Sequence, residues 1–172
     1  CVPKYSNPDG IIYSDETVHR IANMKPAAKD FMLMWDNAYC IHEFDGEFVP
    51  FKDILSECEK YGNADMVFEF ASTSKITFPG AGIACGAVSE ANVEYFKNLL
   101  NIQIISYDKM NQLRHVRFLK NKDGVLQHMA KHRRRLVPCF DAVKTTFAHE
   151  LTPCGDIAHW TNPKGGYFIS LY

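Results

Sequence analysis

The sequence predicts an α/β fold in which a mostly parallel sheet has flanking helices and is followed by part of a smaller α+β domain. Up to residue 100, stretches with helical spacing of apolar residues alternate with short apolar runs, and this alternation is typical of a mostly parallel sheet. After residue 123 the pattern changes to one long amphipathic helix. We therefore place the domain boundary in the region 100–123 and expect domains of residues 1–107 and 108–172.

The first four elements follow from the spacing of apolar residues. The stretch "SDETVHRIANMK" predicts a helix, because Ser14 can cap it and its apolar residues share one face. The apolar run "DFMLMWDNAY" predicts a strand that ends in polar groups. Apolar residues from Phe51 to Cys58 then recur at i, i+3, i+4 and i+7, which predicts a second helix. The run "DMVFEFASTSK" repeats the strand-to-polar pattern and predicts a second strand.

The remaining elements are a third strand, two helices and a terminal strand pair. "AGIACGAVS" is small and apolar, as expected of a strand under closely packed helices, and Ser89 can cap the helix that follows. From Val125 to Leu151, apolar residues recur at three- and four-residue intervals, which predicts a long helix that Pro138 is expected to kink. Two further strands are expected in "DIAHW" and "GYFISLY".

Composition and charge exclude several classes of protein. The chain is 47% hydrophobic and 23% charged, which is ordinary for a globular domain. A net charge of −1 argues against binding nucleic acid or an anionic membrane, since both require a basic surface. No apolar run approaches the roughly 20 residues that span a bilayer, so we expect a soluble, cytoplasmic protein.

The cysteines and histidines of the sequence indicate neither a disulfide framework nor a metal site. The six cysteines contain no Cys-x-x-Cys pair, so we expect reduced cysteines that mostly serve packing. His128 and His132 have the i, i+4 spacing of a metal-binding pair, but "HMAKH" lacks the glutamate of the zinc-protease motif. We therefore assign no metal.

Polar clusters follow two neighbouring strands of the predicted sheet. Asp36 and Tyr39 come after the first strand, and Ser72, Ser74 and Lys75 come after the second. Taken singly, these residues are most often turn or loop residues. Ligands of parallel sheets bind beyond the carboxyl ends of the strands, so we expect both clusters to face one crevice.

The combined set suits one kind of chemistry. The amine of Lys75 can form a Schiff base with a carbonyl, which is how proteins hold and activate pyridoxal phosphate. A carboxylate such as Asp36 can keep the pyridine nitrogen protonated. A phenol can bond the ring oxygen, and hydroxyl groups can bond the phosphate.

Three motifs resemble those of fold-type I aminotransferases, in the family's chain order. "YSNPDG" resembles their Asn-Pro-x-Gly motif, "DNAY" their Asp-x-x-Tyr and "STSK" their Ser-x-Ser-Lys. The segments "KMNQLRHVRFLK" and "NPKGGYFISL" resemble the aspartate-aminotransferase-like group sometimes labelled MocR-type. The resemblance covers nearly the whole chain, as part of a large pyridoxal-phosphate-binding domain and part of a small C-terminal domain.

The resemblance implies pyridoxal 5'-phosphate as cofactor, an amino acid and a 2-oxo acid as substrates, and a homodimer when the protein is full length. It implies that Lys75 is the Schiff-base partner and proton shuttle. By the same resemblance, Ser72 and Ser74 contact the phosphate.

The ring contacts are implied in the same way. Asn7 and Tyr39 would bond the ring oxygen, and Asp36 would pair with the pyridine nitrogen. Relatives also use an arginine from about the region of Arg114 and Arg117, supplied across the dimer, to bind a dicarboxylate side chain. The alternative for these two arginines is a structural ion pair.

The chain also departs from the family pattern. Many relatives hold phosphate with an arginine seven or eight residues after the lysine, where this chain has Gly82 and Ile83. The family's phosphate-binding turn would precede Cys1, and its substrate-carboxylate arginine would follow Tyr172. We therefore expect the 172-residue chain alone to bind cofactor weakly and to be inactive.

An alternative of another class remains open at this point. The same fold serves as a non-catalytic, ligand-sensing module of transcription regulators, joined to a DNA-binding domain. A winged-helix segment before Cys1 would favour that alternative.

Overall fold

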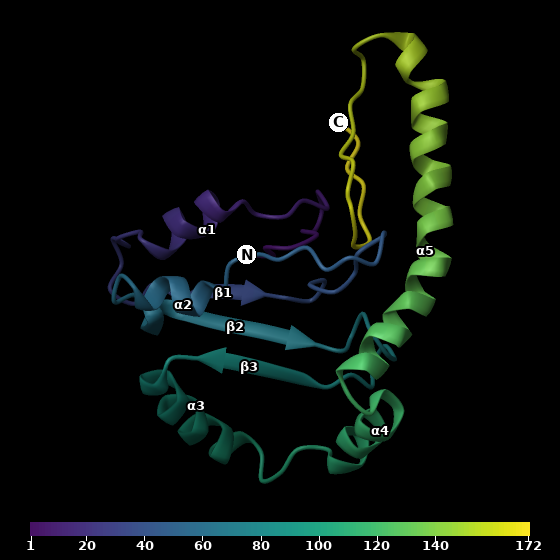
Figure 1. The fold of residues 1–172 in the computed structure, drawn as a ribbon. Helices are drawn as coiled ribbons and strands as arrows, with labels where there is room; N and C mark the ends of the chain where they lie inside the picture. The colour runs from purple at the N-terminus through teal and green to yellow at the C-terminus, as the bar shows by residue number, and fades with distance from the viewer. The chain divides into compact units, whose positions relative to one another are not determined.

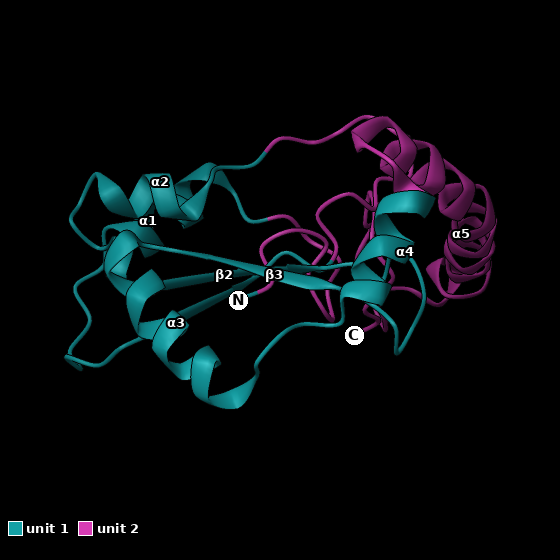
Figure 2. Cartoon of the chain, turned by 90° about the horizontal axis from the view of Figure 1, so that it is seen from below, with its two compact units in different colours: residues 1, 13–38, 51–118 teal, residues 2–12, 39–50, 119–172 magenta.

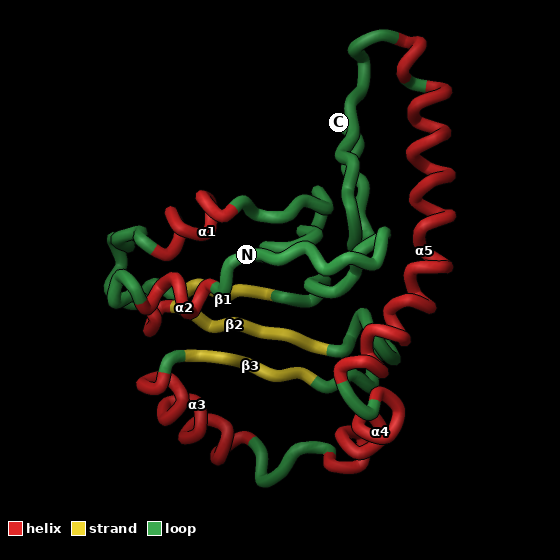
Figure 3. Tube along the Cα trace, in the orientation of Figure 1, coloured by secondary structure: helices red, strands yellow, loops and turns green.

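The computed structural model describes residues 1–172, and its helices and strands follow one another as Figure 1 shows. In chain order the elements are α1 (Asp15–Ala22), β1 (Leu33–Asp36), α2 (Ile54–Glu59), β2 (Val67–Ser72), β3 (Ala84–Val88), α3 (Glu90–Gln103), α4 (Lys109–Leu119) and α5 (Lys122–Glu150), with short 3-10 turns at Ala64–Met66 and Thr152–Cys154. Long loops connect several of these elements (Figure 3). None of the helices combines the length and the apolarity that crossing a membrane requires.

The chain forms two compact units, which Figure 2 distinguishes by colour. The first unit comprises residue 1 and residues 13–38 and 51–118, and it contains the sheet. The second comprises residues 2–12, 39–50 and 119–172, and it contains α5. The division into domains 1–107 and 108–172 stays a prediction.

The sheet has three strands in the order β1-β2-β3. Strands β1 and β2 are parallel, with Asp36 opposite Phe70, whereas β2 and β3 are antiparallel, with Ser72 opposite Ala84. The prediction of a mostly parallel sheet is therefore wrong for the second pair. The reason is the connection: residues 73–83 contain no helix and are too short for the crossover that a parallel pair needs.

The core of the first unit lies between α1, α2 and one face of the sheet. Its buried side chains come from both helices, from β1 and β2 and from the 3-10 turn before β2: Val18, Ala22, Leu33, Trp35, Ile54, Cys58, Met66 and Val67. Along β1, Leu33 and Trp35 are buried while Met34 and Asp36 are exposed, as the two-residue period of a strand requires. The register that buries Trp35 therefore turns Asp36 out of the core.

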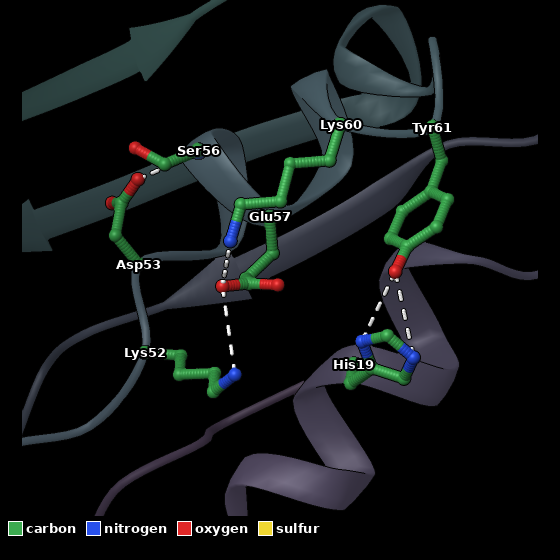
Figure 4. A network of polar contacts seen from close by, with 7 residues as sticks. All are labelled: His19, Lys52, Asp53, Ser56, Glu57, Lys60 and Tyr61. Carbon is green, nitrogen blue, oxygen red and sulfur yellow. Dashed lines mark hydrogen bonds and ion pairs between the residues drawn. The ribbon is translucent and has the colours of Figure 1, made fainter.

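Side-chain caps define the starts of the predicted helices. The Ser14 hydroxyl accepts a hydrogen bond from the backbone N–H of Thr17 at 3.1 Å, and the Ser89 hydroxyl accepts one from Asn92 at 3.4 Å. Helix α2 starts after Asp53, whose carboxylate accepts the Ser56 N–H at 2.7 Å (Figure 4). The helices predicted from periodicity near residues 14, 51 and 89 are confirmed.

The later elements differ more from expectation. The long helix is confirmed as α5 and continues through Pro138. The two terminal strands are reduced to an antiparallel bridge between Trp160 and Leu171, with further backbone hydrogen bonds beside it. Helix α4 was not predicted, although Asp108 accepts a hydrogen bond from the Asn111 N–H at 2.9 Å in the manner of a helix cap.

All six cysteines are free thiols, as expected. The expectation that they mostly serve packing is wrong, because four of them are exposed: Cys1, Cys85, Cys139 and Cys154. Cys58 is the buried one, and burial raises the pKa of its thiol to about 11.

Candidate active site

The first candidate residue, Asp36, ends β1 and is exposed. Its Oδ1 accepts the backbone N–H of Ala38 at 3.0 Å, which forms a tight turn after the strand. Next to it, the Asn37 backbone N–H donates to the Phe70 carbonyl at 2.8 Å and the Asn37 side-chain amide donates to Glu69. These contacts fix the end of β1 against β2. Desolvation by burial, with the nearby charge of Asp53, raises the pKa of Glu69 above its usual value.

The second cluster leaves β2 at the same edge of the sheet, because β1 and β2 are parallel and Asp36 is in register with Phe70. The Ser72 hydroxyl donates to the Ser74 hydroxyl at 3.0 Å. Lys75 lies in a turn closed by the Thr77 N–H, which donates to the Thr73 carbonyl at 2.8 Å. The strand pairing thus brings the end of β1 and the serine–lysine turn to one edge.

Apolar neighbours do not shield Lys75 within these residues. The Lys75 side chain is exposed, and Phe78, three residues further along the chain, is 69% exposed.

Gly82 approaches the serine–lysine turn closely. A Cβ atom at this position would lie 3.3 Å from the Ser74 backbone nitrogen and 3.4 Å from its hydroxyl oxygen. The neighbouring residue, Ile83, forms two hydrogen bonds of 2.9 Å with Thr73. The Ile83 carbonyl accepts the Thr73 N–H, and the Ile83 N–H donates to the Thr73 hydroxyl. The position where many relatives carry an arginine is thus packed directly against Ser74.

Asn7 and Tyr39 belong to the second unit. Asn7 is exposed in a turn in which the Gly10 N–H donates to the Ser6 carbonyl at 2.7 Å. Tyr39 is buried, and its ring contacts three aromatic rings at centroid distances of 5.5 to 5.9 Å: those of His42, Tyr167 and Phe168. Burial, with the neighbouring Tyr39, raises the pKa of Tyr167.

Arg114 and Arg117 are exposed on α4. No acidic side chain of the chain forms an ion pair with either. Structural ion pairing, the alternative for these two arginines, is therefore wrong for residues 1–172. No group of three or more His, Cys, Asp or Glu side chains is arranged to hold a metal ion.

Sequence reasoning missed two residues beside the serine–lysine turn, Asn111 and His115. Both lie on α4. The Asn111 side-chain amide donates to the Ala81 carbonyl, and His115 Nε2 is hydrogen-bonded to the Thr73 and Thr77 hydroxyls. The available signal was their spacing, which places them on one helical face in "NQLRH".

The sequence matches the family described as aspartate amino-transferase over residues 1–172. The chain belongs to this aminotransferase family. The prediction of a fold-type I aminotransferase relationship is confirmed, and the MocR-type subgroup stays a prediction.

Similar proteins carry aminotransferase names, in agreement with the family match. A Mycolicibacterium smegmatis protein that bears an aminotransferase name is 46% identical over 171 residues, which are 99% of this chain and 40% of that protein. The crystal structure of an aspartate transaminase from Corynebacterium glutamicum has a TM-score of 0.94 and 39% identity, and the match covers 99% of this chain and 40% of that one. The chain thus spans about two fifths of the length of these aminotransferases.

A more distant structure shares the aminotransferase fold. LysN, the α-aminoadipate aminotransferase of Thermus thermophilus, has a TM-score of 0.76 at 19% identity, over 99% of this chain and 41% of that one. That structure is complexed with N-(5'-phosphopyridoxyl)-L-leucine.

Proposed function

We propose that the intact protein is a pyridoxal-phosphate-dependent aminotransferase that moves an amino group between an amino acid and a 2-oxo acid. One observation carries the proposal. The turn that holds Lys75 leaves β2 at the sheet edge where Asp36 ends the parallel strand β1. The family match over the whole chain supports the same conclusion.

The donor set at this edge suits pyridoxal 5'-phosphate. The Ser72 and Ser74 hydroxyls are 3.0 Å apart, and both can donate to one phosphate group if the Ser72 hydroxyl turns from Ser74 to the phosphate. Gly82 lets its segment lie directly against Ser74, since an added Cβ would lie only 3.3 Å from the Ser74 nitrogen. The carboxylate of Asp36 is exposed and engages only Oδ1 in a hydrogen bond, so Oδ2 is available to a protonated ring nitrogen.

When bound, pyridoxal phosphate supplies an electron sink that stabilises negative charge on the amino-acid Cα. Asp36 would keep the ring nitrogen protonated, because a carboxylate beside a pyridinium favours its charged form. The amine of Lys75 would hold the cofactor and, once released, would carry a proton to and from Cα. Asn7 and Tyr39 would orient the ring through its oxygen.

The substrate is proposed to be aspartate or another common amino acid. Arg114 and Arg117, which are exposed and form no ion pair, would bind the side-chain carboxylate of a dicarboxylic substrate. We further propose a homodimer, with residues 1–107 in the large cofactor-binding domain and residues 108–172 in the small domain. The C. glutamicum relative, described as an aspartate transaminase, supports the substrate class.

The aminotransferase names of the relatives favour catalysis over the ligand-sensing alternative. The test of the function uses the full-length protein loaded with pyridoxal phosphate, reduced with borohydride and mapped by peptide mass. We expect the pyridoxyl adduct on Lys75, and we expect Lys75→Ala to abolish both the adduct and transamination.

Lys109→Ala is the matched control and should keep both properties, because Lys109 is exposed at the start of α4 and forms no hydrogen bond or ion pair with the turn that carries Lys75. An adduct on Lys52 or Lys109, or normal turnover by Lys75→Ala, would refute the assignment of this lysine.

A further inference from the structure

Helix α4 holds the turn that carries Lys75 through two polar side chains. Asn111 donates from its side-chain amide to the Ala81 carbonyl at 2.9 Å and to the Gly82 carbonyl at 3.3 Å. His115 Nε2 lies 3.1 Å from the Thr73 hydroxyl and 2.9 Å from the Thr77 hydroxyl. Because residues one helical turn apart share a face, one face of α4 contacts both ends of the segment 73–82.

The hydrogen bonds define the role of the imidazole. His115 Nδ1 lies 2.9 Å from the Asn111 carbonyl, which can only accept, so Nδ1 carries the proton. In the neutral imidazole, Nε2 is then an acceptor for the threonine hydroxyls. Each hydroxyl has a second acceptor: the Ile83 carbonyl at 3.5 Å for Thr73, and the Thr73 carbonyl at 3.2 Å for Thr77. Either hydroxyl can therefore donate to Nε2 while the other stays satisfied.

His115 is the only buried residue of α4, with 7% exposure. Within residues 1–172 the apolar residues Met110, Val116 and Phe118 of the helix are 61 to 64% exposed. Helices usually attach to a domain through an apolar stripe. Here the buried contact is polar, and it costs free energy unless every polar atom finds a partner, as those of His115 do. The contacts of α4 with the segment 73–82 are therefore mainly polar, and such directional contacts fix the position of the turn.

We propose that His115, assisted by Asn111, is a positioning residue for Lys75. This inference rests on the proposed aminotransferase function. Thr73 and Thr77 flank Lys75 on either side, so an acceptor shared by their hydroxyls fixes the backbone from which the lysine reaches the reacting atoms. A displacement of about 1 Å in such a group lowers a rate roughly 100-fold.

The test compares His115→Phe with His115→Gln in the full-length holoenzyme. Phenylalanine keeps the ring volume but removes both nitrogens, whereas glutamine keeps a side-chain acceptor for the threonine hydroxyls. We expect His115→Phe to lower kcat about 10- to 100-fold with a nearly unchanged KM for the amino acid. We expect His115→Gln to recover most of that loss.

A second measurement is independent of turnover. Amide hydrogen exchange of the segment 73–83 in the cofactor-free protein should become faster in His115→Phe, since the Ile83 N–H donates to the Thr73 hydroxyl that His115 holds. His149→Phe is the matched control: His149 is exposed near the end of α5 and contacts only its neighbour Glu150, so kcat and exchange should stay as in the parent.

Parent-like kcat and exchange in His115→Phe would overturn the inference. Equal impairment of His115→Gln and His115→Phe would overturn it too, because it would indicate a merely structural histidine. If His115→Phe fails to fold, Thr77→Val provides the test: it removes one hydroxyl at constant volume and should lower kcat and speed exchange in the same segment, and parent-like values would refute the inference. Absence of a Lys75 adduct in the parent refutes the proposed function instead, whatever the exchange result.

Discussion

Gly10 is the position in the Asn-Pro-x-Gly motif where the structure leaves least room for a side chain. Its φ is +68°, a conformation that residues with a Cβ adopt only at a cost. A Cβ there would lie 2.7 Å from Pro163 Cβ and 2.8 Å from the Phe168 carbonyl oxygen. Both distances are shorter than van der Waals contact, so Gly10→Ala must displace either the turn that carries Asn7 or the segment from Pro163 to Phe168.

The expected cost follows from two contributions. The left-handed conformation costs alanine about 1–2 kcal/mol, of which about 0.4–1 kcal/mol is offset because alanine restricts the unfolded chain. Overpacking against Pro163 and Phe168 adds about 1–3 kcal/mol. We therefore expect Gly10→Ala to lower the free energy of unfolding by about 2–4 kcal/mol.

Gly62→Ala is the matched control. Gly62 has nearly the same φ, +70°, but no atom lies within 4 Å of its added Cβ. It should cost only the conformational contribution, about 1 kcal/mol. The assay is urea unfolding of both variants and the parent, with cofactor affinity measured beside it, because a displaced Asn7 turn should weaken binding in Gly10→Ala alone. Equal destabilisation by the two substitutions would refute the reasoning.

Three further outcomes are expected. Burial raises the pKa of Glu69, so its ionisation opposes folding: stability should fall as pH rises from about 4.5 through the raised pKa, and Glu69→Gln, which keeps an acceptor for Asn37, should flatten this part of the unfolding curve against pH. Tyr39→Phe keeps the ring contacts and removes the hydroxyl, so it should weaken cofactor binding; an unchanged Kd would argue against the proposed ring-oxygen contact. The isolated 172-residue chain should show no transamination with common amino acids, and measurable turnover would contradict that expectation.

Periodicity predicted most of the helices and the three strands of the sheet, but it carried no information on strand direction. The run from Ala84 to Val88 was predicted as a strand, and only the short helix-free connection at 73–83 determines that it runs antiparallel to β2. Helix α4 escaped prediction because it lies in the region 100–123, which the change of pattern marked as a domain boundary. Its start was nevertheless encoded by Asp108, which caps it.

The candidate site was predictable to a similar extent. Short motifs identified Asp36 and Lys75, and the parallel pairing of β1 with β2 places the end of β1 and the serine–lysine turn at one edge. No motif indicated His115, because its role depends on which threonines face it across a distance of about 40 residues in the chain. Contacts between segments that are remote in sequence leave no periodic signal.

Gly82 shows why this chain is expected to hold phosphate without the arginine that many relatives place there. The Cβ of an arginine at this position would lie 3.3 Å from the Ser74 nitrogen, so the turn would have to shift by a few tenths of an ångström. The flanking backbone is also committed, since Asn111 bonds the Ala81 and Gly82 carbonyls and Ile83 is bonded twice to Thr73. Glycine lets segment 81–83 lie against the serine–lysine turn and keeps the Ser72 and Ser74 hydroxyls in place. The proposed phosphate contacts therefore rest on hydroxyl groups in a turn that α4 holds at Thr73, Thr77, Ala81 and Gly82, so that the proposed phosphate-binding residues and the proposed positioning residues of Lys75 belong to one turn.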